Sequence, residues 1–148
     1  MRRKTDTSKE DRQPVLICIA MIYLFFVMYI TLFDREIGRR RIMLEPFFEI
    51  RKMIKTQKYE HWLGQIFGNI FLLFPFGVLL PMIFDFFKKT KMTVLAGLSV
   101  SLFIELTQYI TGRGLCELDD VVHNTIGAFA GIILYKRVRY LLRNKIDL

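Results

Sequence analysis

Four apolar blocks, separated by polar segments, dominate the sequence. They predict membrane-spanning helices at about residues 14–33, 66–87, 92–110 and 120–136. A helix needs about 20 consecutive apolar residues to cross the hydrocarbon core of a bilayer, and each block is near that length. The pattern therefore predicts an all-α integral membrane protein with four transmembrane helices, in a membrane domain over residues 14–135.

The first block follows a basic segment, residues 1–13, and so imitates the start of a secretory signal peptide. Its apolar run is longer than the usual core of a signal peptide. Leu32, Phe33 and Asp34, which close the run, offer no small-residue cleavage site. We therefore expect a retained first transmembrane helix that begins at Pro14.

The longest polar connection, residues 34–65, contains a segment with helical periodicity, Pro46–Trp62. Its apolar residues recur at helical spacing: Phe47, Ile50, Met53 and Ile54. Basic side chains fall largely on the other faces, and Pro46 suits the first turn of a helix. This pattern predicts an amphipathic helix in the membrane interface of the first outer loop, with Trp62 as an aromatic anchor. A charged, partly disordered loop is the alternative.

Charge sets the predicted orientation. The chain has 148 residues, 53% of them hydrophobic, and a net charge of +8. The basic residues lie between the apolar blocks, as topology determinants and contacts to anionic lipids do, so we expect membrane lipids and not nucleic acid as partners. The segments on the side of the termini carry 13 Lys and Arg residues, and the other side carries 9. The positive-inside rule then predicts a multi-pass protein of the cytoplasmic (inner) membrane, with residues 1–13 and 137–148 as basic cytoplasmic segments.

Polar residues gather near the outer ends of the second, third and fourth predicted spans. At 1.5 Å per residue, Asn69, Glu105 and Asn124 all lie roughly 6–8 Å below the outer face. A carboxylate inside a membrane helix is costly unless it is paired or neutralised, which points to a functional or pocket-forming role for Glu105. Arg113 is its candidate counter-ion. The candidate cleft residues are Asn69, Glu105, Gln108, Arg113, Asp119, Asp120 and Asn124.

Simpler interpretations exist for several of these residues. Asp119 or Asp120 could cap the fourth helix and complement its dipole. Asn69 and Gln108 could be hydrogen-bonding contacts between helices. His123 is expected to be an interfacial polar residue, because the acids around it follow no metal-ligand spacing. We accordingly predict no metal and no cofactor.

Small and helix-bending residues indicate where the helices pack. Gly127 and Gly131 form a Gly-x-x-x-Gly motif, which lets two membrane helices approach closely. Pro75 removes a backbone donor in the second span, and Gly77 follows it. We assign these four residues to helix packing. The two cysteines, Cys18 and Cys116, lie near opposite faces of the predicted bilayer, roughly 30 Å apart, which excludes a disulfide between them.

Three blocks of the sequence resemble the VanZ-like family of small bacterial membrane proteins: Gly68–Pro81, Ser101–Gly114 and Leu118–Tyr135. Arg41–Phe47 is similar to a short segment that follows the first span in that family. The resemblance implies a cytoplasmic-membrane protein, in some members linked to reduced susceptibility to teicoplanin-type glycopeptide antibiotics. The family's polar signature falls on Asn69, Pro75, Gly77, Glu105, Gln108, Arg113, Asp119, Asp120, Asn124 and Gly127.

Three functions are compatible with these observations. The leading hypothesis is a non-enzymatic membrane protein whose outer-face cleft engages a cell-envelope lipid, a precursor or an amphiphilic antibiotic. The second is a membrane-embedded hydrolase or transferase on a phospholipid or lipid-linked sugar, in which the paired acids with His123 would bind a divalent ion or act as acid and base. Against it, the sequence has no metal-ligand spacing, no activated nucleophile and no phosphate loop. The third is a structural or accessory subunit whose polar stripe binds a partner helix.

Overall fold

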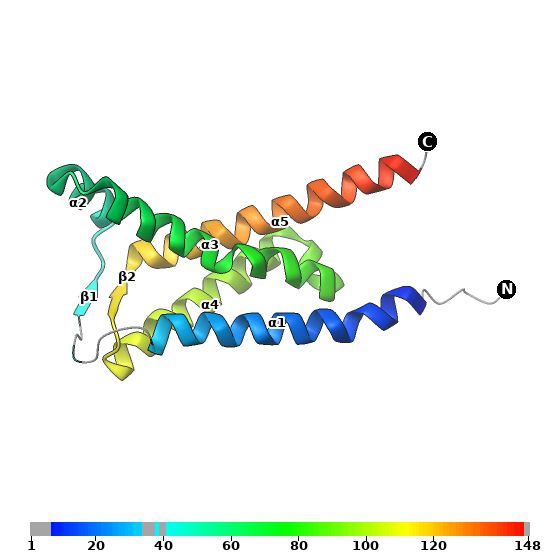
Figure 1. The fold of residues 1–148 in the computed structure, drawn as a ribbon, viewed down its shortest axis with the longest axis horizontal. Coiled ribbons are helices and arrows are strands. Elements are labelled where there is room, and N and C mark those ends of the chain that lie inside the picture. Colours follow the sequence, from blue (N-terminus) through cyan, green and yellow to red (C-terminus); the bar gives the residue numbers. More distant parts are fainter. Residues whose placement is uncertain (1–6, 34–37, 39–40, 147–148) are drawn as a thin grey trace.

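A computed structural model describes residues 7–33, 38 and 41–146, and over these residues the protein is mostly helical. The elements, in chain order, are α1 (Thr7–Phe33), β1 (Arg41–Met43), α2 (Phe48–Thr56), α3 (Tyr59–Ile83), the 3-10 helix η1 (Asp85–Lys88), α4 (Thr90–Thr111), β2 (Leu115–Glu117) and α5 (Leu118–Ile146). Figure 1 shows the strands and α2 together at one end of the molecule. The first residue of α1 and the last of α5 lie toward the opposite end.

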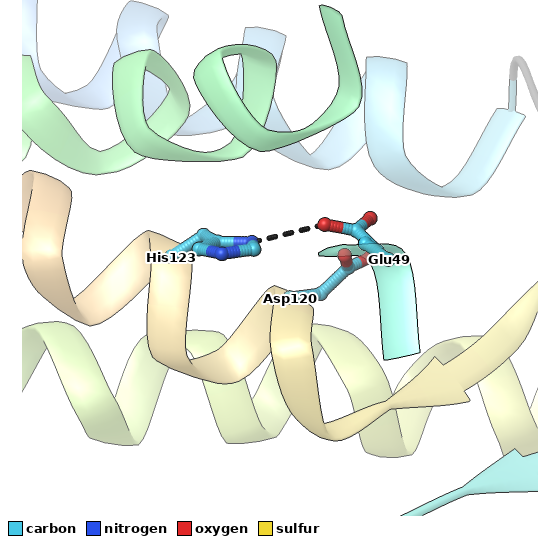
Figure 2. A group of neighbouring side chains, drawn as sticks. All are labelled: Glu49, Asp120 and His123. Carbon is cyan, nitrogen blue, oxygen red and sulfur yellow. Dashed lines mark ion pairs between the residues drawn. The ribbon is translucent and has the colours of Figure 1, made fainter. Parts of the chain in front are cut away.

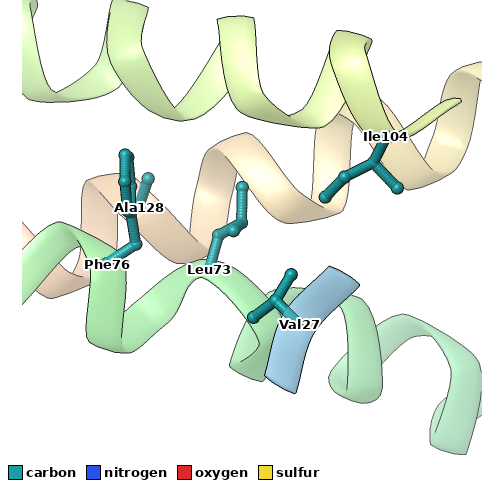
Figure 3. Packing of buried hydrophobic residues seen from close by; sticks show 5 residues of the cluster. All are labelled: Val27, Leu73, Phe76, Ile104 and Ala128. Atoms are coloured by element: carbon teal, nitrogen blue, oxygen red, sulfur yellow. The ribbon is translucent and has the colours of Figure 1, made fainter. Parts of the chain in front are cut away.

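The four long helices pack around one apolar cluster. Its buried members come from α1, α3, α4 and α5, and they are Val27, Leu73, Phe76, Ile104 and Ala128 (Figure 3). Many large apolar side chains point away from this cluster, such as Ile22 and Phe25 on α1, which are 70% and 74% exposed. A surface this rich in apolar side chains suits a hydrocarbon environment better than water.

Three helices of the described chain are long and apolar enough to cross a membrane: Arg12–Phe33, Tyr59–Ile83 and Thr90–Thr111. The fourth predicted span, residues 120–136, lies within α5, which has 29 residues. The first turns of α5 carry Asp119, Asp120, His123 and Asn124, and these side chains lower its hydropathy below that of the other three.

The helix ends differ from those expected from the apolar blocks. Helix α1 begins at Thr7, so Pro14 lies inside it and does not open it. Helix α5 continues through the predicted basic tail to Ile146. Lys and Arg are good helix formers, so a helix can extend past its apolar block without a change of backbone.

The amphipathic segment Pro46–Trp62 forms two helices. Helix α2 ends at Thr56, because Gln57 adopts a left-handed backbone with a φ of 55°. Helix α3 then begins at Tyr59, seven residues before the predicted second span, and Trp62 belongs to α3. Trp62 donates its indole N–H to Oγ1 of Thr56 at 3.0 Å, which connects the two helices.

Strands β1 and β2 form a two-stranded parallel ladder that the hydropathy pattern did not predict. Arg41 pairs with Leu115, and Met43 pairs with Glu117. The ladder joins the connection after α1 to the turn before α5. The ladder therefore holds the segment that precedes α2 beside the first turn of α5.

Helices α3 and α5 come close where glycines replace side chains. A Cβ on Gly131 would lie 2.8 Å from Cα of Gly77, which is closer than real Cβ atoms come to a neighbouring backbone. A Cβ on Gly127 would lie 2.9 Å from the carbonyl carbon of Ile70. The predicted packing glycines therefore lie where these two helices approach, and Pro75 lies inside α3.

Candidate functional site

Asp119, in the first turn of α5, holds the first turn of α2. Its Oδ1 accepts a hydrogen bond from the backbone N–H of Phe47 at 2.8 Å, and its Oδ2 accepts one from Glu49 at 3.0 Å. Phe47 has a left-handed backbone with a φ of 58°, and no side chain of α2 itself caps that helix. Asp119 thus serves as an N-terminal cap for α2, a different helix from the one that the sequence suggested.

Glu49, fixed in this way, meets two residues of α5. Its Oε2 lies 3.2 Å from Nδ1 of His123, within ion-pair distance (Figure 2). Asp120 is three residues before His123 and lies on the same face of α5. One carboxylate oxygen from each acid and one imidazole nitrogen all lie within 4.8 Å of one another. We call Glu49, Asp120 and His123 the carboxylate–imidazole cluster.

The cluster is almost closed to solvent. Glu49 is 2% exposed and Asp120 5% exposed, and the His123 side chain is 12% exposed. Neither Oε2 of Glu49 nor Nδ1 of His123 makes a hydrogen bond within the described structure, although the two atoms are close. Buried polar atoms in native proteins nearly always have a partner, so this pair is unusual.

A polar pocket of about 330 Å³ adjoins the cluster. Asn69 on α3 lines it and donates a hydrogen bond from Nδ2 to Oδ1 of Asp120 at 2.5 Å. The described residues that line it are Ile30, Thr31, Glu49, Gln65, Gly68, Asn69, Leu72, Glu117 and Asp120. Three of these described residues are acidic and none is Lys or Arg. The pocket is therefore acidic, with apolar side chains from α1 and α3 on part of its wall.

Three other predicted cleft residues connect helices and lie outside the pocket lining. Glu105 is 2% exposed, and its Oε2 accepts the backbone N–H of Glu117 at 2.8 Å, which anchors β2 to α4. Gln108 donates to the carbonyl of Thr31 at 2.9 Å. Asn124 donates to Oγ of Ser101 at 3.0 Å. Each contact fixes one helix or strand against another.

Arg113, the predicted counter-ion of Glu105, contacts the end of α1. Its Nη1 lies 3.4 Å from the carbonyl oxygen of Leu32, and its guanidinium lies 5.1 Å from the ring centre of Phe33. These contacts place Arg113 where α1 ends and the turn between α4 and β2 begins.

Sequence reasoning missed Glu49 as a site residue. It gave His123 an interfacial role, with metal binding or acid–base chemistry beside the paired acids as the alternative. One signal was present, because Glu49 is the acidic residue of a helix that otherwise carries basic charge. An amphipathic helix in the interface gains nothing from a buried carboxylate, so Glu49 required a partner elsewhere.

Comparisons with known proteins identify the family of the chain. The model of the protein family VanZ/LLP1 matches residues 16–142 of this chain. The chain is also similar to Protein VanZ of Enterococcus faecium, with 29% identity over 123 residues that cover 81% of this chain and 68% of that protein. No solved structure matches the chain. Because the family match covers most of the sequence, the chain belongs to the VanZ/LLP1 family.

Proposed function

We propose that the protein crosses the cytoplasmic membrane four times, with both termini in the cytoplasm and the acidic pocket toward the outer face. Hydrogen bonds at the two ends of the apolar part of α5 support a fourth crossing. Asp120 meets Asn69 at one end, and Nζ of Lys136 donates to Oγ1 of Thr90 at 2.7 Å at the other. From Asp120 to Lys136 the helix rises about 24 Å at 1.5 Å per residue, close to the thickness of a thin hydrocarbon core.

The position of α1 supports the same arrangement. Nε2 of Gln13 donates to the carbonyl of Ile83 at 3.1 Å, so the start of α1 lies beside the end of α3 and near Thr90. The first residue of α1 and the last of α5 then lie on one side of the bundle (Figure 1). That side is rich in Lys and Arg, which favours the cytoplasm.

We further assign α2 to the membrane interface on the outer side. Its exposed surface carries Ile54, 65% exposed, together with the basic residues Arg51 and Lys55. Apolar side chains beside basic ones suit the boundary between acyl chains and anionic headgroups. Glu49 faces away from that surface and toward α5.

The pocket then engages a cell-envelope lipid, a precursor or another amphiphilic ligand, and thereby reduces susceptibility to teicoplanin-type glycopeptides. The observation that carries this proposal is the lining of the pocket. Asn69 and three carboxylates offer polar contacts to a headgroup, while Ile30 and Leu72 offer apolar contacts to a chain. Pockets that combine a few convergent polar groups with an apolar wall are the usual sites for ligands of this kind.

The test is antibiotic susceptibility in a glycopeptide-sensitive Gram-positive host. Expression of the chain should raise the inhibitory concentration of teicoplanin, and Asp120→Asn should abolish the increase at equal membrane abundance. Glu60→Gln, which changes an exposed acid in the first turn of α3, should retain it. Protection that is equal in Asp120→Asn and in the unmodified chain would contradict the role of the pocket.

A membrane-embedded hydrolase or transferase is the second candidate, favoured by the carboxylates beside His123. Such a protein would convert a lipid-linked substrate, with an acid and a base drawn from the cluster. Only the second candidate would convert its lipid-linked ligand into a product. A purified chain that releases product from a lipid-linked substrate, and loses this activity in His123→Ala, supports the enzyme.

A further inference from the structure

We propose that Glu49, Asp120 and His123 form a binding site for a divalent transition-metal ion, with Zn²⁺ or Mn²⁺ as the expected class. The proposal is independent of any antibiotic phenotype, since it concerns only whether an ion binds. It rests on three observations: the spacing of the ligand atoms, the buried polar atoms without hydrogen bonds, and the charge of the adjoining pocket.

The spacing of the ligand atoms fits a shared ion. Oxygen and nitrogen ligands lie about 2.0–2.1 Å from Zn²⁺ in tetrahedral sites, so two of them are about 3.3 Å apart by geometry. Oε2 of Glu49 and Nδ1 of His123 are 3.2 Å apart. An oxygen of Asp120 supplies a third ligand atom, and one ligand atom from each of the three residues lies within 4.8 Å of the other two. Figure 2 shows Glu49 and His123 directed toward each other, with Asp120 beside them.

The polar atoms of the cluster point to a missing partner. Glu49 is 2% exposed, yet its Oε2 has no hydrogen bond in the described structure, and Nδ1 of His123 has none either. A simple hydrogen-bonded ion pair would satisfy both atoms. A metal ion would accept a lone pair from each of these two atoms, and this needs no hydrogen bond between the carboxylate and the imidazole.

Neighbouring residues form hydrogen bonds to the proposed ligands, as residues around the ligands do in known metal sites. Asp119 binds the backbone N–H of Glu49, so this ligand is fixed by its own main chain. Asn69 donates to Oδ1 of Asp120 and orients that carboxylate. Hydrogen bonds of this kind fix ligand orientation in known metal sites and strengthen binding.

Charge favours a cation here. Glu49, Asp120 and Glu117 line the same pocket, which has no Lys or Arg among its described lining residues. Without a cation this pocket repels an anionic headgroup such as a phosphate. An ion held by three protein ligands keeps a coordination position for a further ligand, and a pocket-side oxygen of the headgroup suits that position.

The donor set selects the class of ion. Imidazole nitrogen suits Zn²⁺ and other transition metals, whereas carboxylate oxygen also suits Mn²⁺ and Mg²⁺. One imidazole with two carboxylates therefore favours Zn²⁺ or Mn²⁺ over Mg²⁺ and Ca²⁺, which prefer oxygen alone.

The test uses the full chain in lipid nanodiscs. After removal of metal with a chelator, the protein is dialysed against ZnCl₂ or MnCl₂, and bound metal is measured by mass spectrometry. We expect one ion per chain, and an affinity at least tenfold lower in His123→Ala and Glu49→Gln. His61→Ala and Glu45→Gln are the matched controls, because both side chains are exposed, and they should bind as the unmodified chain does.

A spectroscopic measurement covers the case in which a cluster variant does not fold. Mn²⁺ bound to the unmodified chain should show coupling to one imidazole nitrogen in pulsed electron paramagnetic resonance. His61→Ala should retain this coupling. Less than a tenth of an ion per unmodified chain, or bound Mn²⁺ without nitrogen coupling, would overturn the proposal, as would equal affinity in His123→Ala and His61→Ala.

Discussion

The hydrogen bonds from α2 to Asp119 lead to a quantitative prediction about the docking of that helix. Asp119→Ala removes both acceptors of the backbone N–H groups of Phe47 and Glu49. A hydrogen bond to a charged group contributes about 1.5–3 kcal/mol, although undocked N–H groups regain water. We therefore expect α2 to lose about 2 kcal/mol of docking free energy, less than the sum of about 3–6 kcal/mol for two such bonds.

Hydrogen–deuterium exchange of residues 48–56 in lipid nanodiscs measures this loss. A change of about 2 kcal/mol raises the population of the open state roughly 30-fold, since 1.36 kcal/mol is a factor of ten. Asp119→Asn should fall between Asp119→Ala and the unmodified chain, because the amide retains one acceptor oxygen. Glu60→Ala, at an exposed acid in the first turn of α3, should leave exchange in this segment unchanged.

The reasoning is wrong if Asp119→Ala and the unmodified chain exchange at the same rate, within twofold, over residues 48–56. In that case the strand pairing of β1 or the contacts of α2 with α3 would hold the helix without its cap. A uniform increase over all helices would instead indicate global destabilisation, and the slow-exchanging core around Leu73 would report it.

Three further predictions concern packing, charge and topology. Gly131→Ala should destabilise the protein by about 1–3 kcal/mol in thermal unfolding, because its Cβ would meet Gly77, whereas Gly64→Ala, with open space around it, should not. Burial and then the charge of Glu105 raise the pKa of the Cys116 thiol, which leaves less thiolate at a given pH. Iodoacetamide should therefore react more slowly with Cys116 than with a model thiol at about pH 8, and faster in Glu117→Gln, which removes another of the raising charges. In a chain without natural cysteines, cysteines at positions 12 and 143 should both resist an impermeant maleimide in intact cells, and one at position 54 should react.

The apolar pattern predicted the long helices because an apolar segment in a membrane has few conformations other than a helix. Backbone polar groups cannot be left unsatisfied in lipid, so each block becomes a helix. The four blocks fall on α1, α3, α4 and α5. The ends were less predictable, since Gln57 stops one helix through its backbone conformation and Ile146 ends another far beyond its apolar block.

The cluster was harder to predict, because it depends on a contact between residues far apart in the chain. Glu49 and His123 are brought together by Asp119, whose simplest interpretation from sequence was as a cap for its own helix. Local sequence does not distinguish a cap within one helix from a cap between two helices, because the carboxylate does the same chemistry in both. The pairing of β1 with β2 is a second long-range contact of this kind.

Docking of α2 and binding at the cluster should be coupled, since Glu49 belongs to both. An ion that binds only when Glu49 is docked must stabilise the docked state. A substitution that undocks α2 must weaken binding in proportion to the docked fraction that is lost. Zn²⁺ should therefore slow exchange over residues 48–56 in the unmodified chain and leave it unchanged in His123→Ala. Asp119→Ala should weaken Zn²⁺ binding although Asp119 lies outside the cluster. If the ion binds with no effect on exchange in this segment, Glu49 is not a ligand, and the ion is held by α5 alone.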